Sequence, residues 1–112
     1  MNKLFDCNVK INHEMTVTAL YQTQYADGPM AILAEFTFSD GQIERHPISV
    51  NLPQSTELKH GEFFLKSWSE LEQVADKLVG SGILVVTGEF AQTGYAIAPV
   101  VTIKNPLDKP EQ

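Results

Sequence analysis

The clearest pattern in the chain is MAILAEFTFSDG, residues 30–41. Apolar side chains stand at every second position up to Phe38, with Glu35 and Thr37 between them. This alternation is the period of a strand with one buried face. The Asp-Gly pair at 40–41 supplies the positive φ of a tight turn between antiparallel strands. The stretch therefore predicts a β-hairpin whose second strand runs over about residues 42–52.

Two further strands are predicted, and in the second the apolar residues change from one face to the other. Residues 14–23 alternate in the same way and predict a half-buried strand whose inward residues are Met15, Val17, Ala19 and Tyr21. Within residues 42–52, the apolar side changes across Arg45-His46-Pro47. A β-bulge there would insert one residue and place Pro47 where no ladder donor is needed.

The period changes to that of a helix over residues 68–79. The apolar residues that follow the helical spacing are Trp68, Leu71, Val74, Ala75, Leu78 and Val79. Two capping boxes fit the start of this helix, Ser67 with Glu70 and Ser69 with Glu72. The first residue of the helix is therefore left open by the sequence.

Two strand patterns follow the helix. Gly80 predicts a left-handed stop at the helix end. Residues 83–86 are a continuous apolar run, which is typical of a strand covered on both faces. Residues 95–103 alternate as a final strand, and Pro99 indicates that this strand lies at a sheet edge or carries a bulge.

These patterns predict an α+β fold of three strands, one helix and two strands. We expect a strongly coiled, mostly antiparallel sheet of about five strands with one amphipathic helix packed on it. Residues 1–103 form a single domain in this prediction, because neither a linker nor a repeat divides them. Residues 104–112 hold two prolines among mostly polar residues and predict a flexible C-terminal tail.

Two segments in the middle of the chain resemble a known family. The segment SVNLP occupies residues 49–53, and EFFLKSWSE occupies residues 62–70. This order resembles a family of small domains of unknown function, found on conjugative elements, plasmids and phages, whose members carry an SVNLP segment followed by an FxKxxSEN segment. The resemblance covers about residues 28–103, and Leu71 stands where that family has Asn. It implies a bacterial or mobile-element accessory protein and supplies no catalytic residues.

The charge balance and the apolar runs exclude several classes of protein. Eight Lys and Arg against fourteen Asp and Glu give a formal charge of −6, the wrong sign for gripping a phosphate backbone. No nucleic acid is therefore expected as a partner. No apolar run is long enough to cross a bilayer. Asp6 interrupts the apolar run that a signal peptide would need, so a cytoplasmic location is expected.

Residues that could carry chemistry form no recognised pattern. His13, His46 and His60 lie far apart, without the spacing of a zinc site. Cys7 has no disulfide partner and no motif that would activate it, which is typical of a passive thiol. The glycines at 80–82 follow a helix, whereas a phosphate cradle precedes one. We therefore expect no catalytic residue, no cofactor and no metal.

The polar face of the predicted helix is acidic. With one carboxylate just upstream, it supplies the candidate partner-binding residues Glu62, Glu70, Glu72 and Asp76. A merely solvated helix face has the same pattern. As a binding surface, these carboxylates would attract a basic protein, or occupy a DNA-binding enzyme by mimicking phosphates.

The function predicted from these features is that of a non-enzymatic accessory protein, of a bacterial mobile element or phage, that acts by binding another protein. The alternative is a small sheet-based module that binds a ligand or single-stranded nucleic acid, since strands with exposed Phe and Tyr can stack bases. Phe36 and Phe38 are in phase with Ile32 and are expected to face the core. This phase favours protein binding over base stacking.

Overall fold

The computed structural model describes residues 1–24, 30–52, 58–94 and 96–104 of the chain. The predicted turn at 25–29 and the predicted tail from residue 105 onward lie outside these residues. The described elements are β1 (Asn2–Lys10), β2 (Met15–Gln24), β3 (Met30–Phe38), β4 (Ile43–Pro47), β5 (Ser49–Val50), β6 (Glu62–Leu65), the 3₁₀ helix η1 (Ser69–Leu71), α1 (Glu72–Gly80), β7 (Leu84–Thr93) and β8 (Ala96–Ile103).

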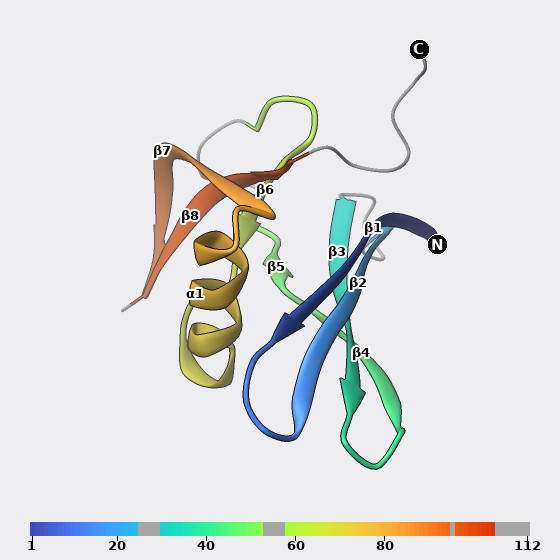
Figure 1. The fold of residues 1–112 in the computed structure, drawn as a ribbon. Coiled ribbons are helices and arrows are strands. Elements are labelled where there is room, and N and C mark those ends of the chain that lie inside the picture. Colours follow the sequence, from blue (N-terminus) through green and yellow to red (C-terminus); the bar gives the residue numbers. More distant parts are fainter. Residues whose placement is uncertain (25–29, 53–57, 95, 105–112) are drawn as a thin grey trace.

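The described strands form two antiparallel sheets of four strands each (Figure 1). Sheet A has the order β1-β2-β3-β4, and sheet B has the order β5-β6-β8-β7. The α+β class and the antiparallel pairing are confirmed. The prediction of one sheet of about five strands is wrong, because β1 and β6 had not been recognised and the second strand of the predicted hairpin divides in two.

That division occurs at Ile48, where the chain passes from one sheet to the other. β4 pairs with β3 in sheet A, and β5 pairs with β6 in sheet B. Between them, the N–H of Ile48 donates to the carbonyl of Ile32 over 2.9 Å, and its carbonyl accepts the N–H of Lys66 over 2.7 Å. The change of apolar side across residues 45–47 therefore marks a change of sheet. The predicted bulge at this point is wrong.

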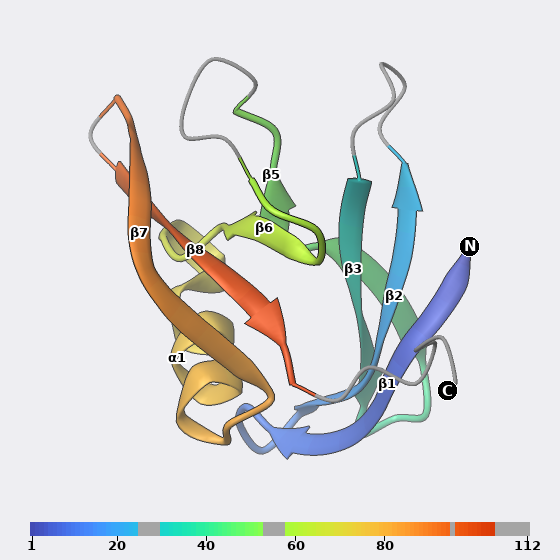
Figure 2. The ribbon, with the colours of Figure 1, turned by 90° about the horizontal axis from the view of Figure 1, so that it is seen from above.

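One hydrophobic core lies between the two sheets, with α1 beside sheet B (Figure 2). Its buried members come from sheet A (Leu4, Val17, Leu20, Ile32, Ala34 and Phe36), from sheet B (Phe63, Leu65, Leu84 and Val101), from the helical segment (Leu71, Val74, Ala75 and Leu78) and from the connections (Ile11, Ile48 and Ile83). The predicted inward residues Ile32, Ala34 and Phe36 of β3 are confirmed, and Phe38 is partly buried against them. The core-facing row of the helix from Leu71 onward is also confirmed.

β2 carries a bulge that changes which side chains face outward. Its register with β3 shifts between Val17 and Ala19. Val17 and Leu20 consequently face the core, whereas Tyr21 reaches the outer face of sheet A, where its hydroxyl accepts a hydrogen bond from Arg45. The prediction that Tyr21 shares an inward face with Val17 is wrong, because the extra residue inverts the alternation.

The helix starts and ends differently from the prediction. The residues that precede η1 and α1, Trp68 and Leu71, make no side-chain capping bond, so neither predicted capping box forms. α1 includes Gly80, and the positive φ falls at Gly82 (φ +84°). In the described part of the chain, no helix is long and apolar enough to cross a membrane.

A smaller apolar cluster lies on the other face of sheet B. Its buried members are Phe64, Ala91, Ala98 and Val100, and Val50, Leu52 and Trp68 pack against them. Phe64 alternates with the core residues Phe63 and Leu65, which places this cluster on the opposite side of the sheet. Trp68 was expected in the core-facing row of the helix, but its extended backbone (φ −133°, ψ 171°) directs it to the smaller cluster.

Candidate functional site

Exposed apolar side chains gather on β7 and β8. Four of the seven large apolar residues that are exposed in the described part of the chain belong to these two strands. They are Val85 (44% exposed), Val86 (46%), Phe90 (59%) and Ile97 (54%), and together we call them the hairpin patch. The other three, Met1, Ile43 and Leu58, lie outside these two strands. Apolar groups that gather on a surface mark interaction sites more often than scattered ones do.

The strand register shows how this patch relates to the core. Val86 lies opposite Val101, and Phe90 lies opposite Pro99. Because side chains alternate along β8, Ile97, Pro99 and Val101 share one face of the sheet. Val101 belongs to the core between the sheets. Val86, Phe90 and Ile97 therefore lie on the core-facing side of sheet B, where the rest of the molecule no longer covers it. Val85 lies on the opposite face.

The exposure of β7 corrects the prediction for residues 83–86. Ile83 and Leu84 are buried, but Val85 and Val86 are exposed, so this run is not covered on both faces. β7 is the last strand of sheet B, and its register with β8 shifts between Val86 and Phe90. A strand with a single neighbour and a local shift leaves side chains in solvent that a central strand would bury.

The shift in β7 also explains Pro99. The sequence left a sheet edge or a bulge open for this strand, and the edge is wrong because β8 lies between β6 and β7. Its pairing with β6 stops at Val100, one residue after Pro99, and the irregularity lies in the facing strand. Gly88 takes a φ of +99° there, and the hydroxyl of Thr87 accepts the N–H of Glu89 over 3.2 Å.

β7 differs from the other edge strands in its length and in carrying a single charge, although its register also shifts once. Proteins protect sheet edges with charges, prolines, short strands and bulges. β5 has only two residues, and β1 has two register shifts. The charged or proline residues on the sheet A edges are Lys3, Asp6 and Lys10 in β1 and Glu44, Arg45, His46 and Pro47 in β4. β7 has ten residues, and Glu89, within the shifted stretch, is its single charge.

The four acidic residues singled out from the sequence do not form one surface. Glu72 and Asp76 are exposed on α1, four residues apart, and therefore lie on the same side of the helix. Glu70 precedes them in η1. Glu62 lies in β6, on the face of sheet B that carries Phe64, and accepts the N–H of Lys59 over 2.9 Å. The structure brings Glu72 and Asp76 together and places Glu62 elsewhere.

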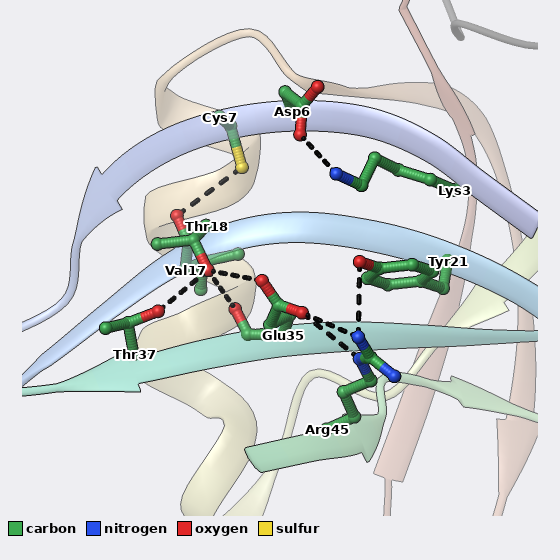
Figure 3. Close-up of polar contacts among 9 residues, drawn as sticks. All are labelled: Lys3, Asp6, Cys7, Val17, Thr18, Tyr21, Glu35, Thr37 and Arg45. Atoms are coloured by element: carbon green, nitrogen blue, oxygen red, sulfur yellow. Dashed lines mark hydrogen bonds and ion pairs between the residues drawn. The ribbon is translucent and has the colours of Figure 1, made fainter. Parts of the chain in front are cut away.

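A polar network occupies the outer face of sheet A (Figure 3). Arg45 places its Nε 3.1 Å and its Nη2 3.0 Å from Oε1 of Glu35. Its Nη2 also donates to the hydroxyl of Tyr21 over 3.3 Å, and its guanidinium carbon lies 4.3 Å from the centre of that ring. Thr18 donates to Oε2 of Glu35 over 3.0 Å. The polar groups of these side chains are hydrogen-bonded to one another across three neighbouring strands.

The electrostatics of Glu35 favour a structural role. Burial raises its pKa, but hydrogen bonds with Thr18, Arg45 and Tyr21 and the charge of Arg45 lower it more, so the pKa lies below its ordinary value. The side chain is 15% exposed. A general base works best with a pKa near the working pH. Glu35 is instead held ionised with its oxygens already engaged.

Cys7 is a protected thiol. Burial, together with the charges of the Asp6 and Glu35 carboxylates, raises its pKa to about 11. Its Sγ lies 3.5 Å from the carbonyl oxygen of Val17, to which it donates. The thiolate is the nucleophilic form of cysteine. A thiol that stays protonated at neutral pH favours the passive reading of this residue.

The histidines remain apart in the folded chain. His13 lies between β1 and β2, His46 lies in β4, and His60 precedes β6. Across residues 1–24, 30–52, 58–94 and 96–104, no group of three or more His, Cys, Asp or Glu side chains is placed to hold a metal ion.

Comparisons with known proteins give no relative. No protein-family model, no curated protein and no solved structure matches the chain. The resemblance to the mobile-element family therefore stays a prediction. The function has to be argued from the geometry of the molecule.

The hairpin patch is the feature that sequence reasoning missed. The available signal was Gly88 inside the strand pattern, since a glycine there suggests a bulge. A bulge next to an apolar run indicates a strand that is not fully covered. The position of β7 at the sheet edge carries no local signal, because it depends on how distant strands pair.

Proposed function

We propose that this chain is a non-enzymatic accessory protein that acts by binding another protein, and that β7 with the hairpin patch is its binding surface. The observation that carries the proposal is the contrast between β7 and the other edges. A ten-residue edge strand with one charge lies beside exposed Val86, Phe90 and Ile97. Edge strands of this kind are templates for pairing with another chain.

The binding mode that fits this surface is strand addition. An extended segment of the partner lies along β7, and main-chain hydrogen bonds supply much of the affinity. Every second side chain of that segment faces the hairpin patch. The partner segment is therefore expected to carry apolar residues at alternate positions, which exclude water over Val86 and Phe90.

The charge of the molecule suggests the surroundings of that segment. The formal charge is −6, and α1, which carries Glu72 and Asp76, packs against β7. Complementary charge speeds association more than it strengthens the final complex. We propose that the partner is basic around its apolar segment, and that Glu70, Glu72 and Asp76 attract it. A role for Glu62 would require a separate contact, because it lies on another element.

The setting of this function rests on the sequence. The resemblance over residues 28–103 supports an accessory protein of a bacterial mobile element or phage.

Base stacking, the alternative, receives less support from the geometry. Tyr21 is the aromatic side chain on the open face of sheet A, with Lys3 5.9 Å and Arg45 4.3 Å from its ring centre. Single-stranded nucleic acid needs a free ring face and a basic track. Arg45 already stacks on Tyr21 and is tied to Glu35. The ring is therefore engaged within the protein.

Affinity capture from bacterial lysate tests the proposal. The wild-type chain is expected to retain a stoichiometric protein, identified by mass spectrometry. Val86→Lys places a charge on the edge and should lower affinity for that protein by at least about tenfold. Ile43→Lys is the matched control, because Ile43 is 60% exposed on the charged edge strand β4 and should retain the partner.

Two outcomes contradict the proposal. If Val86→Lys keeps a native circular dichroism spectrum and full affinity, β7 is not the binding surface. If nucleic acid, detected by its ultraviolet absorbance, co-purifies in place of a protein, the alternative module is the better description.

A further inference from the structure

A cleft between sheet A and the helical segment lies away from β7 and shares only Glu70 with the proposed function. It has a volume of about 440 Å³ and lies between β4 on one side and η1 with the start of α1 on the other. Other hollows on the described surface are more open to solvent. None of the residues that line it belongs to β7 or β8. Its size falls in the range of small-molecule sites, which is roughly 300 to 1,000 Å³.

The cleft has an apolar floor and a charged mouth. Phe36, Phe38 and Leu71 contribute to the floor. His46, Lys66 and Glu70 also line it. An apolar floor with a few polar groups around it is the usual composition of a site for a small organic molecule. The floor would hold the body of such a molecule, and the charges would orient it.

The two full charges are not paired with each other. The described ion pairs join Lys3 to Asp6, Arg45 to Glu35 and His46 to Glu44, and none joins Lys66 to Glu70. Lys66 and Glu70 line the same cleft outside ion-pair distance, although the charge of Lys66 lowers the pKa of Glu70. A cation and an anion placed in this way suit a ligand that carries both charges. The ammonium of Lys66 complements a carboxylate, and the carboxylate of Glu70 complements an ammonium.

The fold fixes the backbone of Lys66 and the surroundings of the Glu70 carboxylate. The N–H of Lys66 is fixed to Ile48 at the crossing between the sheets. Ser69 has a φ of +61°. A residue other than glycine adopts this left-handed conformation only at a cost in free energy, when the surrounding structure imposes it. The N–H of Glu70 itself, the hydroxyl of Ser69 and the charge of Lys66 lower the pKa of Glu70. The Ser69 hydroxyl thus adds to the backbone N–H in favouring the ionised carboxylate of Glu70.

We propose that this cleft binds a small zwitterion with an apolar side chain, of the class of the hydrophobic α-amino acids. The apolar side chain lies on Phe36, Phe38 and Leu71, the carboxylate contacts Lys66 and the ammonium contacts Glu70. The His46 ring, held by Glu44 over 2.8 Å and 5.8 Å from the Phe36 ring, forms the wall toward β4. The inference is independent of the binding surface on β7.

A nuclear magnetic resonance titration with L-phenylalanine tests the inference. The amide signals of Phe38, His46 and Leu71 should shift and saturate below about 10 mM ligand, which corresponds to weak but specific binding. Lys66→Gln and Glu70→Gln should each weaken binding by about tenfold or more. Glu72→Gln is the matched control, because Glu72 is exposed on α1 and does not line the cleft.

Ligand analogues keep the test independent of the variants. L-Phenylalaninamide lacks the carboxylate, and N-acetyl-L-phenylalanine lacks the ammonium. Each should bind the wild-type chain about tenfold more weakly, and the amide should lose nothing further in Lys66→Gln, as expected when both changes remove one contact. The absence of saturable shifts at these residues would overturn the inference. Equal binding of L-phenylalanine and both analogues would also overturn it.

Discussion

The exposed side chains of sheet A are mostly polar and paired with one another, whereas those at the β7 edge of sheet B are mostly apolar. The outer face of sheet A carries a polar network centred on Glu35, and its edge strands carry charges, a proline and register shifts. Sheet B ends in β7, a long strand with one charge and apolar side chains in solvent. Both sheets share one core. Charges on both edges and register shifts in β1 therefore mark sheet A, whereas sheet B leaves apolar side chains exposed along one edge.

The largest expected effect comes from damaging the core that the sheets share. Leu78 is fully buried among residues of the core between the sheets. Leu78→Ala should lower the free energy of unfolding by about 2 to 5 kcal/mol, since it removes apolar contacts and leaves a cavity. Urea denaturation measures the change. Lys77→Ala, at the neighbouring exposed position, should stay within about 0.5 kcal/mol of wild type. An unchanged midpoint for Leu78→Ala would show that α1 does not hold the sheets together.

The next effect is the rate at which the Cys7 thiol reacts in the folded chain. At pH 8, a pKa of about 11 leaves Cys7 far less ionised than an exposed cysteine. Alkylation by iodoacetamide should therefore be roughly a hundredfold slower in the folded chain than in urea, and should accelerate as the pH rises toward 11. Mass spectrometry follows the reaction. Equal rates in the folded and unfolded chain would contradict a closed β1.

A smaller effect is expected from the polar network of sheet A. Glu35→Gln keeps the shape of the side chain but removes its charge, and should cost about 1 kcal/mol, because Arg45 is partly exposed and solvent screens the pair. The matched control is Glu44→Gln, whose side chain is 48% exposed beside His46 and should change stability little.

The pH dependence of this network has a defined sign. The folded pKa of Glu35 lies below its unfolded value, so the ionised carboxylate stabilises the fold above the unfolded pKa of about 4.3. That contribution is lost as the pH falls through the folded pKa. The stability difference between wild type and Glu35→Gln should be full at neutral pH and shrink on acidification below about pH 4. A difference that grows in acid would show that burial, rather than Arg45, dominates.

The smallest effect on stability is expected at the acidic face of α1. Reversing Glu72 and Asp76 to Lys changes the formal charge from −6 to about −2. Loss of favourable charge near the helix start should cost about 0.3 to 1 kcal/mol. Association with the captured partner should slow and become less sensitive to salt. Complete loss of binding by a folded double variant would move the contact from β7 to this helix face.

Local patterns were sufficient for the elements that are regular. The alternation of β3 has no bulge, and the residues it directs inward, including Ile32 and Phe36, are buried. The helical spacing likewise identified Leu71 and Leu78 as core residues. In these elements, the position of each side chain follows from the period alone.

The remainder depends on irregularities and on distant pairing. Two register shifts in β1 interrupt its alternation, and the bulge in β2 turns Tyr21 outward. The apolar run at residues 83–86 predicts a strand, but its residues do not indicate whether another strand covers it. The candidate cleft joins β4 to Lys66 and Glu70, which are brought together by the crossing at Ile48.

That crossing has a consequence for how the protein comes apart. The peptide groups of Ile48 bond to β3 on one side and to Lys66 on the other, so neither sheet opens without disturbing a residue that the second sheet also uses. Two sheets tied through one buried position and one core unfold as a single cooperative unit. The amides of Ile48 and Lys66 then exchange their hydrogens with water only through global unfolding, while the ends of β7 exchange through local fraying.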